Sequence, residues 1–367
     1  AQMNRLRNGV FDHGWTLAYF VNMIRLSAKR AGRMDEYRPL FQKWLKDAKA
    51  PFSMLTDDAY RHLPLRDWGD WFADIAPFLK DLLTLAPGDE LWRHHDYRQQ
   101  PEAFNVPAFH VGSWYDAYLA DTLAMFQGMR DHAGTEFARK SQRLLVGPWA
   151  HLFPFAEPTT GGTGEIDFGP HAAINLHEIQ LPWLDQYLRP ETLAGSDIAP
   201  VRIFVMGRNE WRNENEWPLA RTRYTPVYLH SEGTANGLAG NGRLDFGQPG
   251  DQPADRYAYD PDDPVPTLGG TGLGVALGVF DQTEIESRLD VLVYTSDPVE
   301  NELEVTGPVT LILFASSDAP DTDFMAKLID VHPDGYAQIV VEGVVRARYR
   351  NSSDSPKLMT DGEVCKF

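Results

Sequence analysis

The sequence predicts a chain in which three structural classes follow one another: a helical segment, a short α/β segment and an all-β segment. Apolar residues recur at helical spacing through residues 1–103. Short apolar strands alternate with helices over residues 104–198, which is typical of a sheet covered by helices. From residue 199 to residue 367, strand-like runs are separated by Gly, Pro and Asp turns, which favours an antiparallel sandwich.

Three helices are expected in the first segment. Leu17, Phe20 and Ile24 share one face of the first helix, and Gly32 is a plausible stop for it. The second helix is expected over residues 35–48. The third is expected over residues 70–85, where Pro77 divides it and a Pro-Gly pair ends it.

The second segment predicts two buried strands joined by a helix. The strands cover residues 106–111 and 144–146, and the helix between them covers residues 117–129. A further helix is expected over residues 174–188, with Ile174, Leu181, Leu184 and Leu188 on one side.

The third segment predicts a β-sandwich or jelly roll with long loops over residues 232–281 and no internal repeat. Its expected strands are residues 201–205, 225–230, 291–294, 309–314, 324–331 and 339–344.

Composition excludes several classes of partner. The chain has 52 acidic and 34 basic residues and a formal charge of −18, so it repels phosphate backbones and nucleic acid is not expected as a partner. It has no apolar run of about 18 residues, so no membrane-spanning helix is expected. Its single cysteine, Cys365, permits no internal disulfide and favours a reducing, cytoplasmic compartment. Homo-oligomerisation is left open.

Two short motifs indicate a catalytic pair. Gly-Ser-Trp-Tyr-Asp ends in Asp116, Val-Gly-Pro-Trp-Ala-His ends in His151, and each motif closes one of the predicted strands. An α/β-hydrolase sheet presents the acid and the base of a Ser–Asp–His triad in this chain order. Taken singly, Asp116 could be a helix N-cap and His151 a loop histidine. Their joint position at the ends of successive strands favours the catalytic interpretation.

These motifs resemble those of the α/β-hydrolase family that includes bacterial cocaine esterase, the α-amino-acid ester hydrolases and Xaa-Pro dipeptidyl-peptidase. The resemblance runs from about residue 9 to the end of the chain. The stretches that carry it are residues 112–116, 147–151, 201–207 with Trp211 and Trp217, 290–296, 319–324 and 330–335.

The resemblance implies an α/β-hydrolase fold with a partial sheet, a helical cap over residues 1–103, the second half of the catalytic domain over 104–198, and a jelly roll over 199–367 that is incomplete at its end. It also implies a serine on an earlier Gly-x-Ser-x-Gly turn, with an oxyanion hole formed by that turn and an earlier tyrosine. No Gly-x-Ser-x-Gly occurs in the chain. Ser113 lacks the flanking glycines and would point to the face opposite Asp116, so we expect this chain alone to be inactive.

The resemblance also bears on the substrate. Ala117, Tyr118 and Leu119 follow Asp116, and the next carboxylate is Asp121. The α-amino-acid ester hydrolases have acidic residues close behind their catalytic Asp, which hold the substrate ammonium. A neutral acyl ester therefore fits better here than an amino ester or a peptide N-terminus.

The candidate substrate contacts are the aromatic residues of the two motifs: Trp114, Tyr115 and Trp149. No cofactor or metal is expected, because the neighbouring His94 and His95 would point apart. Three alternatives stay open: a binding protein without chemistry, an Xaa-Pro dipeptidyl-peptidase or amino-ester hydrolase, and a carbohydrate-binding sandwich with an unrelated helical domain.

Overall fold

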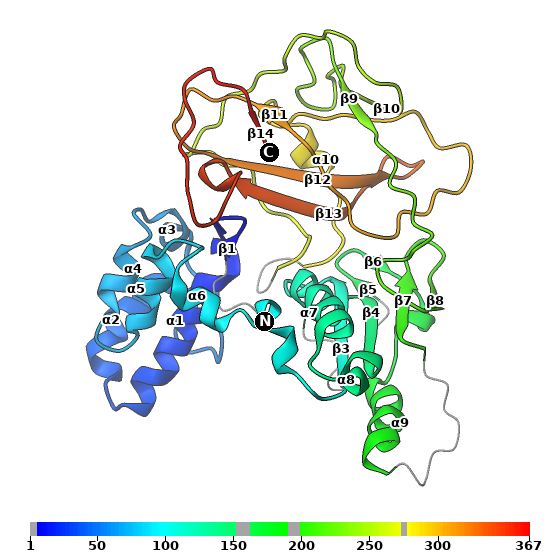
Figure 1. Ribbon diagram of the computed structural model, residues 1–367. Coiled ribbons are helices and arrows are strands. Elements are labelled where there is room, and N and C mark those ends of the chain that lie inside the picture. Colours follow the sequence, from blue (N-terminus) through cyan, green and yellow to red (C-terminus); the bar gives the residue numbers. More distant parts are fainter. Residues whose placement is uncertain (1–5, 152–161, 190–198, 273–276) are drawn as a thin grey trace.

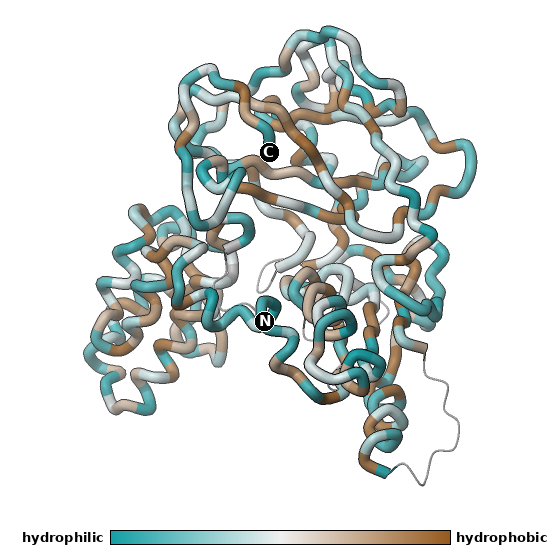
Figure 2. Tube along the Cα trace, viewed as in Figure 1, coloured by the Kyte–Doolittle hydropathy of each residue, from teal (hydrophilic) through white to brown (hydrophobic). Residues whose placement is uncertain are grey.

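The computed structural model describes residues 6–151, 162–189, 199–272 and 277–367. The helical cap and the α/β part lie side by side, and the C-terminal β domain lies across both (Figure 1). Hydrophobic residues recur along the cap helices and the sheet strands (Figure 2). None of the helices among the described residues combines the length and the apolar composition of a membrane-spanning segment.

The cap begins with a two-stranded hairpin and continues with short helices around its own core. Its elements are β1 Leu6–Arg7, β2 Val10–Phe11, α1 His13–Arg30, α2 Met34–Trp44, α3 Asp57–Arg61, α4 Asp67–Trp71, α5 Pro77–Thr84, α6 Glu90–His95, and the 3-10 turns η1 Tyr97–Gln99 and η2 Pro101–Ala103.

The predicted helices of the cap are present, with shorter bounds. Leu17 and Ile24 on α1 are buried in the cap core, and Gly32 follows the helix at φ 69°. The second helix ends at Trp44, because Leu45 turns extended and forms a β-bridge with Leu55. Pro77 starts α5 as a separate helix, as the sequence predicted.

The α/β part is built on a four-stranded sheet of order β3-β4-β7-β8, in which β8 alone is antiparallel to its neighbour. Its elements are β3 Ala108–Tyr115, α7 Leu119–His132, α8 Glu136–Lys140, β4 Gln142–Ala150, β5 Gly162–Thr163, β6 Ile166–Asp167, η3 Pro170–Ala172, α9 Leu176–Leu188, β7 Val201–Val205 and β8 Glu210–Glu214.

One expectation for this part needs correction. The strand Val201–Val205 was expected in the sandwich, but it pairs in parallel with β4 through Leu144 and Val146. A run of buried β-branched and aromatic residues is the same in a parallel sheet and in a sandwich, so composition could not assign it. The helix expected over residues 174–188 is present as α9 but begins at Leu176. Its leucines are largely exposed: Leu181 at 56%, Leu184 at 39% and Leu188 at 74%.

The C-terminal β domain has fewer paired strands than the sequence suggested. Of the expected strand over residues 309–314, only Phe314 lies in a ladder. Within residues 291–294 only Leu292 forms a β-bridge, with Asn236. The elements are β9 Tyr228–His230, β10 Arg243–Asp245, α10 Thr283–Glu286, β11 Phe314–Ala315, β12 Asp323–Val331, β13 Ala337–Arg346, η5 Ala347–Tyr349 and β14 Cys365–Lys366.

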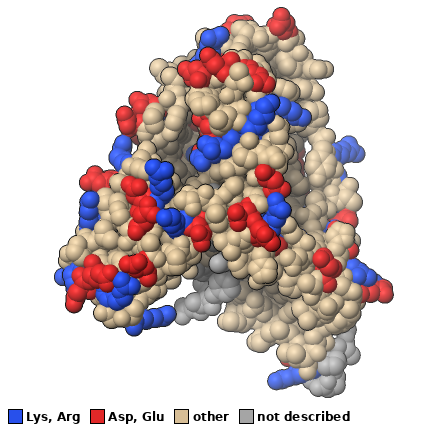
Figure 3. Space-filling view, turned by 60° about the vertical axis from the view of Figure 1, so that its left-hand side comes forward, with Lys and Arg blue, Asp and Glu red and all other residues tan. Residues whose placement is uncertain are grey.

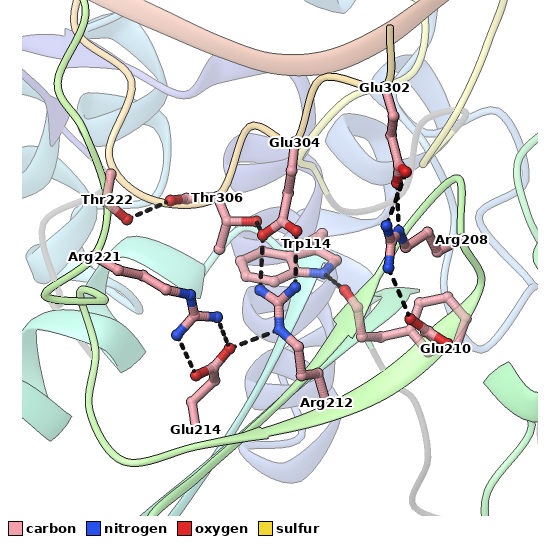
Figure 4. A network of polar contacts seen from close by, with 11 residues as sticks. Trp114, Arg208, Glu210, Arg212, Glu214, Arg221, Thr222, Glu302, Glu304 and Thr306 are labelled. Carbon is pink, nitrogen blue, oxygen red and sulfur yellow. Dashed lines mark hydrogen bonds and ion pairs between the residues drawn. The ribbon is translucent and has the colours of Figure 1, made fainter.

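Ion pairs connect the outer strand of the sheet to the β domain (Figure 4). Arg212 on β8 donates two hydrogen bonds to Glu304, at 2.7 and 2.8 Å, and one to Glu214. Glu214, whose side chain is 8% exposed, also accepts from Arg221. Arg208 pairs with Glu302 beside them. On the face that carries the cap, acidic and basic side chains are interspersed (Figure 3).

Candidate active site

The carboxyl ends of β3 and β4 bring Asp116 and His151 together. His151 Nδ1 lies 3.1 Å from Oδ1 and 3.1 Å from Oδ2 of Asp116. The Asp116 side chain is 14% exposed and the His151 side chain is 25% exposed. The hydrogen-bond contact predicted from the strand ends is therefore present, at the carboxyl edge of a parallel pair of strands.

Asp116 also organises the turn that leads into α7. Its Oδ1 accepts the backbone N–H of Tyr118 at 2.7 Å, and its carbonyl accepts that of Leu119 at 3.1 Å. Asp116 is not the N-cap of α7, which is Tyr118; its carboxylate stabilises the turn before the helix and holds the imidazole at the same time. The two roles are compatible because a carboxylate can accept several hydrogen bonds.

An irregularity in β4 precedes the histidine. The register runs from Ser113 opposite Gly147 to Tyr115 opposite Ala150, so β4 uses one extra residue there. A Cβ on Gly147 would lie 2.2 Å from a carbon of the Trp149 ring. Glycine at this position therefore lets the Trp149 indole fold back against the strand.

Tyr118 contributes a contact that the sequence did not reveal. Its ring lies 5.1 Å from the His151 ring, at an interplanar angle of 47°. The imidazole is thus held at Nδ1 by the Asp116 carboxylate and packed by an aromatic ring. No spacing rule marks a residue in this position, because the contact depends on the turn after β3.

The aromatic residues of the motifs lie in the core instead of lining a substrate site. Tyr115 and Trp149 are 0% exposed. The Tyr115 hydroxyl donates to the Ile339 carbonyl, and burial raises the pKa of Tyr115 to about 12. Trp149 Nε1 donates to the Ala172 carbonyl. Trp114 is partly buried and donates to the Phe204 carbonyl at 2.8 Å.

Two further observations concern possible reactive groups. Ser113 is only 2% exposed, which fits its exclusion as a nucleophile. Among the residues that the structure describes, no group of three or more His, Cys, Asp or Glu side chains could hold a metal ion.

The β domain reaches the site through its backbone. Gly272 forms a parallel β-bridge with Asp116, although the two residues belong to different parts of the fold. The sequence predicted only long loops over residues 232–281. A contact between a loop and a distant strand end leaves no periodic signal in the sequence.

Asp121, one turn beyond Asp116 on α7, is paired with a cation. Arg98 Nη1 donates to Asp121 Oδ1 at 2.7 Å, and the same guanidinium donates twice to Asp96. Asp96 is 5% exposed, and its pKa is lowered chiefly by the hydrogen bond from Arg98.

The pair of His151 and Asp116 can accept and return a proton. With Nδ1 engaged by the carboxylate, the other ring nitrogen, Nε2, is the atom that would exchange a proton with a reacting group. A carboxylate on Nδ1 fixes the tautomer and stabilises the imidazolium. This is the arrangement of a general base and the residue that orients it.

Comparison with known proteins gives consistent matches. Residues 15–153 match the X-Pro dipeptidyl-peptidase (S15 family), and residues 196–367 match the X-Pro dipeptidyl-peptidase C-terminal non-catalytic domain. The chain is 40% identical over 296 residues to cocaine esterase of Rhodococcus sp. (strain MB1 Bresler). The aligned region covers 79% of this chain and 50% of that protein.

Two solved structures share the fold. An α-amino acid ester hydrolase superposes with a TM-score of 0.66 at 23% identity, covering 83% of this chain and 51% of its own. An aminopeptidase from a marine sediment Thaumarchaeota archaeon superposes with a TM-score of 0.70 at 23% identity, covering 98% of this chain and 57% of its own. The chain therefore spans about half the length of the relatives that it matches.

Proposed function

Because this chain belongs to the α/β-hydrolase family that includes the X-Pro dipeptidyl-peptidases and cocaine esterase, we propose that it supplies the acid–base half of a serine acyl-ester hydrolase. In this proposal His151 is the general base and Asp116 orients it. The observation that carries the proposal is the 3.1 Å contact between His151 Nδ1 and the Asp116 carboxylate at the ends of adjacent parallel strands.

The chemistry follows from that geometry. His151 Nε2 takes the proton of a serine hydroxyl while the oxygen attacks the ester carbonyl. The imidazolium then gives the proton to the leaving alcohol as the tetrahedral intermediate collapses to an acyl-enzyme. In the second half of the reaction the same nitrogen activates water, which hydrolyses the acyl-enzyme. Asp116 keeps its negative charge throughout and stabilises the imidazolium.

The serine is proposed to lie outside these 367 residues. The sequence contains no Gly-x-Ser-x-Gly, and the Ser113 side chain is buried, with its residue 2% exposed. We therefore expect the chain alone to hydrolyse p-nitrophenyl acetate no faster than its His151→Ala variant. An acyl-enzyme burst that Ser113→Ala abolishes would contradict this expectation and identify Ser113 as the nucleophile.

Complementation tests the role of the pair itself. When this chain is joined to the part of cocaine esterase outside the matched 50% of that protein, we expect ester hydrolysis that falls about 10⁴-fold in Asp116→Asn and also collapses in His151→Ala. His177→Ala is the matched control, because His177 is an exposed histidine on α9, and it should retain full activity. Hydrolysis that survives both Asp116→Asn and His151→Ala would leave the non-catalytic binding protein as the better description.

A neutral acyl ester is the proposed substrate class. Asp121 is the nearest carboxylate after Asp116 in the chain, and its ion pair with Arg98 offsets its charge. A substrate ammonium would have to compete with that guanidinium. We expect the complemented enzyme to prefer a neutral p-nitrophenyl ester to an α-amino-acyl p-nitroanilide or ester. The opposite preference would favour the amino-ester hydrolase or dipeptidyl-peptidase alternative.

A further inference from the structure

The N-terminal hairpin of the cap is attached to the β domain. The Asn8 carbonyl accepts the backbone N–H of Arg346 at 3.0 Å, and Asn8 Nδ2 donates to the Val344 carbonyl at 2.9 Å. The turn needs positive φ at two residues, 46° at Asn8 and 86° at Gly9, which suits an Asn-Gly pair. The turn is tightly packed, since a Cβ on Gly9 would lie 2.1 Å from the Tyr349 ring.

Arg7, in the first strand of this hairpin, holds one residue of the β domain at two points. Its Nη1 donates to the Thr271 hydroxyl at 3.1 Å, and its Nη2 donates to the Thr271 carbonyl at 3.0 Å. The guanidinium also lies 3.6 Å from Glu342 and 3.4 Å from Asp12. Three chain segments therefore converge on one cation.

Glu342 completes the arrangement from β13. The Thr271 hydroxyl donates to Glu342 Oε1 at 3.2 Å, and the Glu342 side chain is only 9% exposed. Because the Glu342 carboxylate has so little access to water, removing Arg7 would leave its charge poorly compensated. Thr271 is thus fixed through its hydroxyl and its carbonyl.

The next residue, Gly272, forms the β-bridge with Asp116. Gly272 is buried. A displacement of Thr271 would therefore move the backbone that lies against the acid of the proposed triad. Because Asp116 holds His151 at only 3.1 Å, a shift of a few tenths of an ångström would change the hydrogen bond between them.

We infer that Arg7 is a positioning residue for the proposed catalytic pair, acting through Thr271 and Gly272 on Asp116. The inference rests on the proposed function, since it assigns Arg7 a role in setting the geometry of that pair. If Arg7 has this role, the contact between Asp116 and His151 at the ends of β3 and β4 depends on the docking of the cap hairpin onto the β domain.

The experiment measures the proton on His151 Nδ1 directly, in the 367-residue chain. A hydrogen bond to a carboxylate moves this proton to low field in the NMR spectrum, and Asp116→Asn identifies the resonance by changing it. The variants compared are Arg7→Ala, the milder Thr271→Val, and Arg61→Ala. Arg61 is the matched control, because its Nη1 also links the cap to the β domain, at the Asp262 carbonyl at 3.0 Å, without contacting Thr271.

We expect Arg7→Ala to broaden or shift the His151 resonance towards that of Asp116→Asn, Thr271→Val to do so to a smaller extent, and Arg61→Ala to leave it unchanged. Circular dichroism establishes that each variant is folded, and Thr271→Val decides the question if Arg7→Ala does not fold. An unchanged resonance in the folded variants, or an equal change in Arg61→Ala, would overturn only the role of Arg7 and leave the proposed catalytic pair intact. A resonance insensitive to Asp116→Asn would overturn the catalytic pair as well.

Discussion

His151 Nδ1 lies 3.1 Å from each carboxylate oxygen of Asp116. The two residues are 35 positions apart in the chain, and the parallel pairing of β3 with β4 brings them together. The position of His151 also depends on the last residues of β4, where Gly147 is followed by the buried Trp149.

Gly147→Ala is expected to destabilise the protein by about 1–3 kcal/mol, as overpacking of a core does. The new Cβ would lie 2.2 Å from the Trp149 ring, and Trp149 is 0% exposed, so the indole has no free space to enter. Urea unfolding followed by tryptophan fluorescence measures the change. The displaced β4 should also weaken the contact between His151 and Asp116.

Gly343→Ala is the matched control for this substitution. Gly343 also lies in a strand, β13, but a Cβ there would have no atom within 4 Å. Its effect should stay within about 0.5 kcal/mol. Equal free energies of unfolding for the two variants would mean that Trp149 adjusts without cost.

The acid stability of the cap should depend on His13. Its Nε2 is buried and has no hydrogen-bond partner among the described residues, and its ring packs near Phe11 and Tyr60. Burial lowers the pKa of His13 from 6.5 to about 4. His13 is also the first residue of α1, where the positive end of the helix dipole disfavours an imidazolium.

The sign of the effect follows from proton binding. Between about pH 4 and pH 6.5 the unfolded chain binds a proton at His13 that the folded chain does not. The free energy of unfolding should therefore fall as the pH drops through this range, by up to about 3 kcal/mol. His13→Phe should remove that part of the pH dependence. An unaltered pH profile in this variant, measured by thermal unfolding, would exclude His13 as its source.

The contact between Asp116 and His151 could be predicted from the sequence, because each residue belongs to a motif that closes a recognisable strand. Asp116 and His151 each follow a strand, and successive parallel strands end at the same edge of a sheet. The aromatic neighbours were misjudged for the opposite reason. Whether Trp149 faces a substrate or the core depends on the irregular register of β4, which residue type alone does not encode.

Sequence motifs could not predict the long-range contacts between the cap and the β domain. Arg7 meets Thr271 across 264 positions, and neither residue belongs to a periodic pattern. The Asn8–Gly9 turn of the hairpin does carry a recognisable signal, because Asn-Gly favours a tight two-residue turn. That signal predicts a hairpin but does not identify its partner in the β domain.

Glu214→Gln should destabilise the ion-pair network on β8, in which Arg212 joins Glu214 to Glu304 of the β domain. The carboxylate is 8% exposed and accepts from Arg212 and Arg221, and its pKa is lowered chiefly by the hydrogen bond from Arg221. We expect a loss of about 2 kcal/mol in the free energy of unfolding, because hydrogen bonds to a charged group are lost at a poorly solvated site. Chemical unfolding in urea measures it.

Glu210→Gln at the other end of β8 serves as the control. Glu210 lies 3.6 Å from Arg208, and its side chain is 57% exposed. Exposed pairs of this kind contribute little, so the change should stay below about 0.5 kcal/mol. A loss at Glu210 as large as that at Glu214 would indicate that burial is not what makes the network stabilising.

The exposed leucines of α9 should make the isolated chain self-associate. Leu181, Leu184 and Leu188 are 56%, 39% and 74% exposed. Among the described strands, β3 pairs with β4 alone, so one of its edges has no strand partner. An apolar helix face and an unpaired edge both favour contact between copies. Size-exclusion chromatography at increasing concentration should therefore give a rising apparent mass.

A charge placed on that helix should reverse the association. Leu188→Lys is expected to shift the chain towards the monomer, because burying an unpaired ammonium between copies is costly. Leu63→Lys is the control, since Leu63 is 71% exposed in the cap and lies outside α9. If both substitutions lower the apparent mass equally, net charge is the cause and α9 is not the interface. A wild-type chain that stays monomeric at every concentration would show that these leucines do not drive association.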